Sequence, residues 1–226
     1  MNLVYSGKTK DVYALQDGNF LLQFKDDATG ADGVFDPGAN QVALKIDGSG
    51  KAGLQMSVHY FQLLQEAGIK THFLAADLEN VTMTVIPVQP FGKGVEVICR
   101  LRSAGSFAKR FGQYAAPNTH LPEYVEMTLK DDERGDPIIS QELLVFFHIL
   151  SPAEYDEIVA MTKKIALIVR DDLAAHGLEL YDLKLEFGRA DGVICLMDEV
   201  SGGCMRVFKG DQPLDPIALS ELITIL

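Results

Sequence analysis

The clearest pattern of polar and apolar positions in the chain runs from Tyr181 to Phe187. Apolar and charged residues alternate without interruption through this stretch, which predicts a β-strand with one apolar face and one charged face. The charged positions are Asp182, Lys184 and Glu186. Alternation alone favours a charged strand face that is exposed to solvent. Whether the charged face is part of a functional site depends on the segment that follows.

That next segment, Val193–Met197, is apolar at every position and predicts a strand covered on both faces. A five-residue connection, Gly188–Gly192, would pair Phe187 with Val193. In that register Asp198 joins the charged face of the first strand. The sequence therefore predicts a single patch that contains the following residues: Asp182, Lys184, Glu186 and Asp198.

Carboxylates at the end of a covered strand need a partner that offsets their desolvation. Mg²⁺ is typically held by one or two carboxylates plus substrate phosphates, so Glu186 and Asp198 suffice in number. Lys184 lies between them and could neutralise a phosphate or an acyl oxygen. The patch therefore indicates metal-assisted phosphate chemistry.

Two basic turns are the other candidates for anion binding. Lys8 and Lys10 follow a glycine turn that is neither a Walker A loop nor a GxGxxG loop, and they could cover phosphates or be solvated surface lysines. The segment Arg100–Arg110 carries four cations beside Gly105-Ser106, with Ser106 as the expected helix N-cap. A helix start of this kind favours a phosphate site over a basic surface turn.

Periodicity and turn residues predict the remaining elements. Strands are expected at residues 3–5, 11–15, 20–24, 81–88 and 96–101, and helices at 56–67, from Ser151 to Gly177, and near 216–225. The segments Lys25–Gly33 and Gly48–Gly53 are expected to be an acidic loop and a flexible segment. Pro87–Gly94 is the expected hinge, which divides the chain into lobes at 1–90 and 91–226.

Composition narrows the class of protein further. With 226 residues, 47% of them hydrophobic, the chain can form one large domain or two lobes. The net charge of −12 argues against nucleic acid or an anionic membrane as partner. There is no long apolar run or signal segment, and the three cysteines have no zinc spacing. We expect a soluble protein of a reducing compartment, with His59 and His72 in structural roles.

Six ordered segments together resemble the SAICAR synthetase family, the ATP-dependent ligases of purine biosynthesis. The most specific is DLKLEFG at Asp182–Gly188, followed by Asp198-Glu199-Val200-Ser201. The others are Gly7–Tyr13, Phe24–Gly33, Ala67–His72, Arg100–Ser106 and Lys130–Ile138. The family commonly has Pro-Asp where Gly202-Gly203 stand here, and Arg-Asn where Arg100-Leu101 stand.

The resemblance implies an α+β fold with two lobes, a small N-terminal antiparallel sheet lobe and an ATP-grasp-like C-terminal lobe. It implies that ATP and Mg²⁺ serve a reaction joining L-aspartate to the carboxylate of carboxyaminoimidazole ribonucleotide (CAIR) through an acyl phosphate. It also implies a cytoplasmic enzyme of small-molecule substrates that forms homo-oligomers. A ligase or phosphotransferase for another carboxylate, and a non-catalytic nucleotide-binding paralogue, are the alternatives.

The resemblance also implies a role for each matching site residue. Lys184, Asp182 and Asp136 would be catalytic, and Glu186 and Asp198 would bind the nucleotide's Mg²⁺. The nucleotide-covering hairpin would comprise Lys8, Lys10 and Val12, and the substrate would be held by Arg100, Ser106, Lys130 and Arg206.

Overall fold

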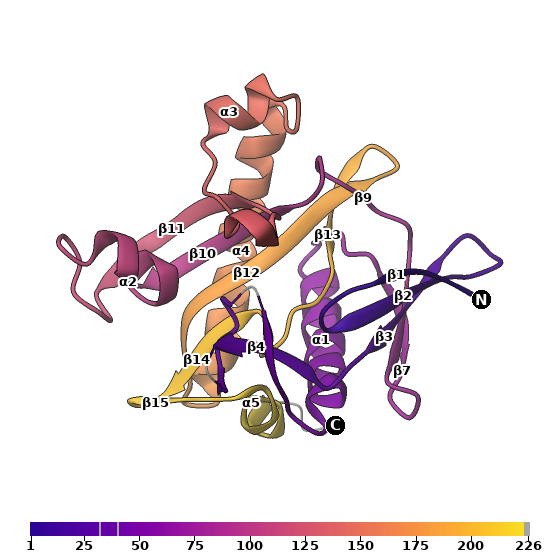
Figure 1. The fold of residues 1–226 in the computed structure, drawn as a ribbon, viewed down its shortest axis with the longest axis horizontal. Coiled ribbons are helices and arrows are strands. Elements are labelled where there is room, and N and C mark those ends of the chain that lie inside the picture. The colour runs from indigo at the N-terminus through magenta and orange to yellow at the C-terminus, as the bar shows by residue number, and fades with distance from the viewer. Residues whose placement is uncertain (32, 40, 224–226) are drawn as a thin grey trace.

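The computed structural model describes residues 1–31, 33–39 and 41–223, which form two large antiparallel sheets and a small third one (Figure 1). The N-terminal sheet has the strand order β1-β2-β3-β8-β7. Its strands are β1 (Asn2–Ser6), β2 (Lys10–Ala14), β3 (Phe20–Phe24), β7 (Phe73–Asp77) and β8 (Thr82–Val85). The three N-terminal strands expected from the sequence are confirmed, because short apolar runs separated by glycine turns favour antiparallel hairpins.

Helix α1 (Ser49–Glu66) packs against β3 and β7 of this sheet and begins earlier than the sequence predicts. The expected flexible segment Gly48–Gly53 is therefore wrong, since its last five residues form the start of the helix. A Cβ atom at Gly50 would lie 2.9 Å from the Lys25 backbone, so this glycine allows close approach rather than flexibility. The helix ends as predicted, with Gly68 in the left-handed conformation at φ 77°.

The segment predicted to be an acidic loop instead forms strand β4 (Asp27–Ala31), which pairs with β5 (Val34–Phe35) and β6 (Val42–Lys45). The prediction failed because its turn-rich composition hides the pairing with β6, which follows a further ten residues along the chain. Asp32 of that predicted loop lies outside the described residues.

The second large sheet has the order β11-β10-β12-β14-β15, with β9 and β13 also paired to β12. Its strands are β9 (Gln89–Pro90), β10 (Val95–Arg102), β11 (His120–Leu129), β12 (Glu179–Ala190), β13 (Val193–Met197), β14 (Met205–Lys209) and β15 (Gln212–Pro213). Helix α4 (Pro152–Ala175) covers one face of this sheet (Figure 1). Its predicted start is confirmed: Ser151 and Glu154 form a reciprocal capping box.

The hairpin between β12 and β13 corrects the predicted register. Strand β12 continues to Ala190, and the turn is only Asp191-Gly192, both with positive φ. An Asp-Gly pair with these φ angles is a preferred two-residue hairpin turn. Glu186 lies opposite Met197, whereas the predicted five-residue connection would place it opposite Ile194. In the observed register a straight strand would therefore put Asp198 on the other face of the sheet from Glu186. Asp198 therefore reaches the Glu186 side by another route, described below.

Smaller elements complete the fold. Helices α2 (Gly105–Phe111), α3 (Gln141–Phe146) and α5 (Pro216–Ile223) and the 3₁₀ turn η1 (Asp132–Arg134) connect or flank the strands. Residues 224 and 225 of the predicted last helix lie outside the described residues. The lobe boundary near residue 90 stays a prediction; β9, inside the expected hinge, pairs with β12. No helix among the described residues is long and apolar enough to cross a membrane.

Candidate functional site

The site residues named from the sequence line two neighbouring cavities on the face of the large sheet opposite α4. The first, here called the arginine cavity, has a volume of about 400 Å³ and contains Arg100, Ser106, Asp182 and Arg206. The second, here called the lysine cavity, has a volume of about 160 Å³ and is lined by Lys8, Lys10, Val12, Lys130, Glu186 and Asp198. Lys184 and Asp136 line both cavities and so mark their junction.

The strand register explains why these polar side chains share one face. Residues directly opposite each other on antiparallel strands point to the same side of the sheet. Arg100 on β10 lies opposite Asp182 on β12, which in turn lies opposite Arg206 on β14. Lys184 and Glu186 follow at intervals of two along β12 and therefore point the same way. The shared face predicted for Asp182, Lys184 and Glu186 is confirmed.

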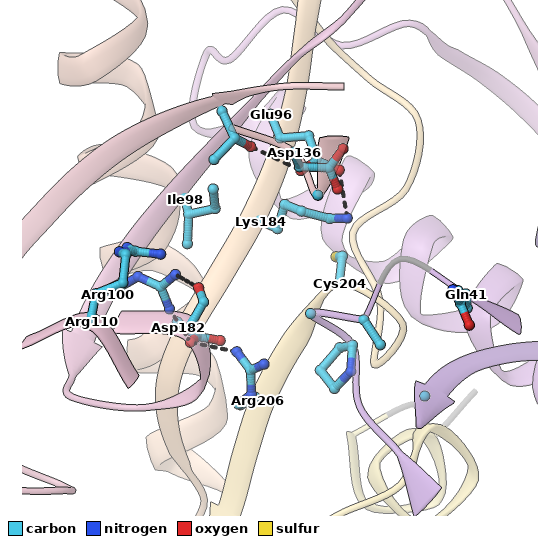
Figure 2. A pocket seen from close by; sticks show the side chains of 17 residues that line it. Gln41, Glu96, Ile98, Arg100, Arg110, Asp136, Asp182, Lys184, Cys204 and Arg206 are labelled. Atoms are coloured by element: carbon cyan, nitrogen blue, oxygen red, sulfur yellow. Dashed lines mark hydrogen bonds and ion pairs between the residues drawn. The ribbon is translucent and has the colours of Figure 1, made fainter. Parts of the chain in front are cut away.

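A chain of alternating charges crosses the arginine cavity. The Asp182 carboxylate accepts hydrogen bonds from Arg100 Nη1 at 2.9 Å and Arg206 Nη1 at 2.7 Å (Figure 2). Arg100 also donates to the buried Glu126 carboxylate at 2.7 Å, and Arg206 Nη2 donates to Asp36 at 2.6 Å. These pairs fix the two guanidinium groups at the cavity wall. Charged groups buried to this degree need such partners to offset their desolvation.

Ser106 does not have the predicted capping role. Helix α2 begins at Gly105 with Ala104 as its N-cap, and no side chain caps it. The Ser106 hydroxyl instead accepts a hydrogen bond from Arg100 Nη2 at 2.9 Å. The prediction of an N-cap was wrong because the helix begins two residues earlier, at Gly105 with φ 52°. Ser106 still lines the arginine cavity.

Lys184 is held by a carboxylate that the sequence analysis did not name. Its Nζ donates to Glu96 Oε1 at 2.8 Å, and Thr128 Oγ1 donates to the other oxygen of Glu96 at 3.0 Å. Burial opposes the charged form of Lys184, but Glu96 outweighs it and raises the pKa of the amine. Lys184 therefore presents a fixed positive charge where the two cavities meet. Figure 2 shows its ammonium group turned toward the Glu96 carboxylate.

Glu186 and Asp198 face the same cavity although they come from opposite sides of the hairpin. Burial raises the pKa of the Glu186 carboxyl, and the nearby Asp198 charge raises it further. Lys130 Nζ donates to Glu186 at 2.6 Å, and Lys10 Nζ lies 3.2 Å from Asp198. Lys130, expected in the substrate pocket, lines the lysine cavity and contacts this carboxylate, and its substrate-binding role stays a prediction.

The β1–β2 hairpin supplies one wall of the lysine cavity. Lys10 is buried and contacts both Asp198 and Glu199, and Lys8 Nζ lies 2.6 Å from Asp132 Oδ1. Val12, two residues further along β2, also lines this cavity and an adjoining apolar cavity of about 430 Å³. The hairpin thus lies against the large sheet at this cavity, and its predicted role in covering a nucleotide stays a prediction.

Asp136 and Asp182 differ in environment. Asp136 has a positive φ of 46° and accepts a hydrogen bond from the Asp131 backbone N–H at 2.7 Å. Burial raises the pKa of its carboxyl. Asp182 is only 3% exposed and is paired with two arginines, so it orients those cations rather than facing solvent.

The carboxylate pair fits a divalent cation only in part. In residues 1–31, 33–39 and 41–223, no three His, Cys, Asp or Glu side chains cluster as a metal site. Glu186 and Asp198 are two partly buried oxygen donors whose mutual repulsion a cation would relieve. Such a pair suits Mg²⁺ that takes its other ligands from phosphates and water.

Three acidic residues of the site escaped the sequence analysis. Glu96 is the polar position of an otherwise apolar strand start, a signal that could have been recognised. Glu199 pairs with Lys10 and adjoins Asp198, so the Asp-Glu dipeptide was itself a clue. Asp36 carried no such signal, because its pairing with Arg206 joins residues 170 positions apart.

Comparison with known proteins agrees with this geometry. A family model described as SAICAR synthetase matches residues 3–215. A phosphoribosylaminoimidazole-succinocarboxamide synthase of Clostridium tetani is 52% identical over 225 residues, covering 99% of both chains. A solved SAICAR synthetase in complex with ADP has a TM-score of 0.83 and 34% identity, covering 94% of this chain and 87% of that one. The corresponding synthase from Ehrlichia chaffeensis has a TM-score of 0.84 and 28% identity, covering 95% and 89%.

The fold and the site thus define an ATP-dependent ligase. Both the family match and the identity extend over nearly the whole chain. The chain belongs to the SAICAR synthetase family, the ligases of purine biosynthesis. The predicted α+β fold and the predicted family are confirmed.

Proposed function

We propose that the two cavities hold the two halves of one reaction, with CAIR in the arginine cavity and the ATP triphosphate in the lysine cavity. The observation that carries this proposal is the position of Lys184, which lines both cavities and has its charge fixed by Glu96. A group at this junction can contact a carboxylate and a γ-phosphate together. Positioning and charge neutralisation then provide most of the catalysis.

CAIR is anchored by its phosphate at Arg100, Ser106 and Arg206. Guanidinium groups suit phosphate because their fork of donors matches its oxygens. Asp182 accepts a hydrogen bond from each arginine and so orients both guanidinium groups, which makes it a positioning residue. The phosphate replaces Asp36 on Arg206 when CAIR binds, since both anions need the same Nη2 donor.

The nucleotide lies under the β1–β2 hairpin. Lys8 and Lys10 neutralise its phosphates, and Val12 with the adjoining apolar cavity covers the base. The ADP complex of a solved relative supports nucleotide binding by this chain. Glu186 and Asp198 hold Mg²⁺, which when bound neutralises charge on the phosphate oxygens. Lys130 keeps Glu186 oriented through its 2.6 Å contact.

The chemistry proceeds in two displacements. A carboxylate oxygen of CAIR attacks the γ-phosphorus of ATP, the bond to the β-phosphate oxygen breaks, and ADP leaves. The amine nitrogen of L-aspartate then attacks the acyl carbon and inorganic phosphate leaves. Lys184 stabilises the negative charge in both steps. Asp136, whose pKa is raised by burial, accepts the proton that the amine loses.

ADP release tests the proposal when ATP, Mg²⁺, CAIR and L-aspartate are omitted one at a time. We expect turnover to require all four components. ADP formation that is indifferent to CAIR would favour a ligase or phosphotransferase for another carboxylate. Tight ATP binding without turnover would favour a non-catalytic paralogue. Either result would overturn the assignment of the arginine cavity to CAIR.

The proposal also covers the cellular location and the oligomeric state of the enzyme. We expect it to act on small molecules in the cytoplasm as a homo-oligomer, without binding nucleic acid or membranes. The net charge of −12 and three free buried cysteines support this expectation. Sedimentation velocity at several protein concentrations measures the oligomeric state, and a monomer at all of them would contradict that part.

A further inference from the structure

The backbone of Asp198 is left-handed, with φ 68°, directly after β13 ends at Met197. This conformation costs a residue other than glycine roughly 1 kcal/mol or more, so the surrounding structure must hold it. The register supplies the reason for it. Glu186 lies opposite Met197, so a continued strand would place Asp198 opposite Leu185, on the buried apolar face. The left-handed residue turns the chain back and lets Asp198 reach the Glu186 side.

His72 contacts the peptide that makes this turn. Its Nε2 lies 3.1 Å from the carbonyl oxygen of Asp198, and the side chain is only 3% exposed. A carbonyl oxygen can only accept a hydrogen bond, so Nε2 carries the hydrogen in this contact.

His72 is itself fixed from several sides. Its backbone N–H donates to the Leu196 carbonyl at 2.9 Å, and its own carbonyl accepts from the Ile86 N–H at 2.9 Å. The Leu196 N–H donates in turn to the Lys70 carbonyl at 2.9 Å. The His72 ring meets the ring of Phe61 edge-on, with centroids 5.4 Å apart. The imidazole thus holds Asp198 from a rigid position beside β13.

We propose that His72 is a positioning residue that keeps the Asp198 carboxylate turned toward Glu186 for divalent cation binding. The inference rests on the proposed metal role of this carboxylate pair. Beyond that role, the left-handed turn at Asp198 and the histidine that holds it both serve to orient the metal-binding carboxylate. Residues that orient metal ligands in this way typically change metal affinity about 10–100-fold when they are replaced.

Mn²⁺ binding in the presence of ADP, measured by electron paramagnetic resonance, tests the proposal without any catalytic readout. His72→Phe keeps an aromatic ring against Phe61 but removes the donor, and we expect it to weaken Mn²⁺ binding about tenfold or more. His72→Gln can place an amide N–H where Nε2 lies, and we expect affinity within about threefold of wild type. His72 also lines the apolar cavity assigned to the base, so metal-free ADP binding is measured in parallel, and we expect His72→Phe to weaken it less than it weakens Mn²⁺ binding.

His59→Phe is the matched control. His59 lies on α1, pairs with Asp172 on α4 at 3.0 Å, and lines neither the arginine nor the lysine cavity. We expect it to leave Mn²⁺ affinity unchanged. If His72→Phe fails to fold, His72→Asn replaces it, since an asparagine amide falls short of the Nε2 position and should lose affinity where glutamine retains it.

The outcomes separate this inference from the proposed metal site. Wild-type protein with ADP that binds no Mn²⁺ would overturn the carboxylate pair as a metal site, and the role of His72 with it. Wild-type binding that His72→Phe or His72→Asn leaves unchanged would overturn the role of His72 alone. Equal losses of Mn²⁺ and metal-free ADP affinity would also overturn it, because they indicate general damage to the cavity.

Discussion

The Arg206 guanidinium on β14 lies 2.6 Å from the carboxylate of Asp36, which follows β5 in the N-terminal part of the chain. Asp36 thus occupies one donor of a cation that we assign to the substrate phosphate. Burial opposes ionisation of Asp36, but Arg206 outweighs it and the pKa of the carboxyl is lowered. Near pH 7 the carboxylate is charged and competes with any phosphate for Arg206.

Asp36→Asn should therefore improve binding of the phosphate-bearing substrate. Loss of a competing contact worth roughly 1 kcal/mol lowers the KM for CAIR about fivefold. Steady-state kinetics at saturating ATP and aspartate measure this change. Asp17→Asn, in an exposed turn, is the control. An unchanged or higher KM for CAIR would mean that Asp36 helps to hold the substrate rather than competing with it.

Lys184→Ala should lower kcat by about 10²–10³, the usual effect of losing one preorganised electrostatic contact. Lys70→Ala is a matched control, because Lys70 Nζ contacts only the Ala190 carbonyl among the contacts described for it, at 3.2 Å, and lines neither catalytic cavity. The rate of ADP release under saturating substrates checks both variants. A change of less than about threefold in Lys184→Ala would remove this residue from the mechanism.

Arg206→Ala should raise the KM for CAIR and leave the KM for ATP nearly unchanged. A charged hydrogen bond worth about 2 kcal/mol corresponds to roughly a 30-fold effect. Arg170→Ala, an exposed arginine paired with Asp171 on α4, controls for loss of charge. Thermal unfolding accompanies the kinetics because Asp182 loses one of its two arginines. Equal increases in both KM values would contradict the phosphate-anchor role.

The pH dependence of stability can be checked at Glu154, which lines neither the arginine nor the lysine cavity. Its hydrogen bond with Arg189 lowers the pKa of the carboxyl to about 2, with further help from the Ser151 backbone N–H. A lowered folded-state pKa stabilises the protein above the unfolded pKa of 4.5, and this contribution is lost as pH falls toward 2.

Urea unfolding of wild type and Glu154→Gln measures that contribution. For this partly exposed ion pair we expect the wild type to be more stable by about 0.2–1 kcal/mol at pH 7. The difference should shrink as pH falls from 4.5 toward 2. Glu157→Gln, at an exposed position of the same helix, is the control. A difference that stays constant down to pH 2 would show that charge is not its origin.

Gly188→Ala should disturb nucleotide binding selectively. A Cβ atom at this position would lie 2.4 Å from the Gln89 carbonyl oxygen, so β9 must move away from β12. Val88 and Pro90, next to this contact, line the apolar cavity assigned to the base. We expect overpacking of about 1–3 kcal/mol and a severalfold higher KM for ATP.

The KM for CAIR should remain unchanged in Gly188→Ala, since the arginine cavity lies at the other end of β12. Gly18→Ala provides the control: this glycine has a positive φ, but no atom lies within 4 Å of its added Cβ. It should lose stability without a specific effect on ATP. A parallel rise in both KM values for Gly188→Ala would contradict the assignment of the apolar cavity to the base.

Local patterns were sufficient for much of the fold. The Ser151-Pro152-Glu154 helix start and the three N-terminal strands depend on interactions between residues near one another in sequence, which local spacing encodes. The strand β4 and the first turns of α1 were not predicted, because they depend on contacts between residues far apart in sequence. Their stability comes from pairing with β6 and from contacts of Gly50 with the Lys25 backbone.

For the site, the sequence by itself determined which side chains of β12 share a face, because the period of a strand fixes the alternation of Asp182, Lys184 and Glu186. It also determined the family, through motifs that need no coordinates. Tertiary structure alone decided how Asp198 comes to face Glu186, since a left-handed backbone held by His72 reverses what the register would give. It also decided the partners Glu96 for Lys184 and Asp36 for Arg206, because each contact joins strands or loops that only folding brings together.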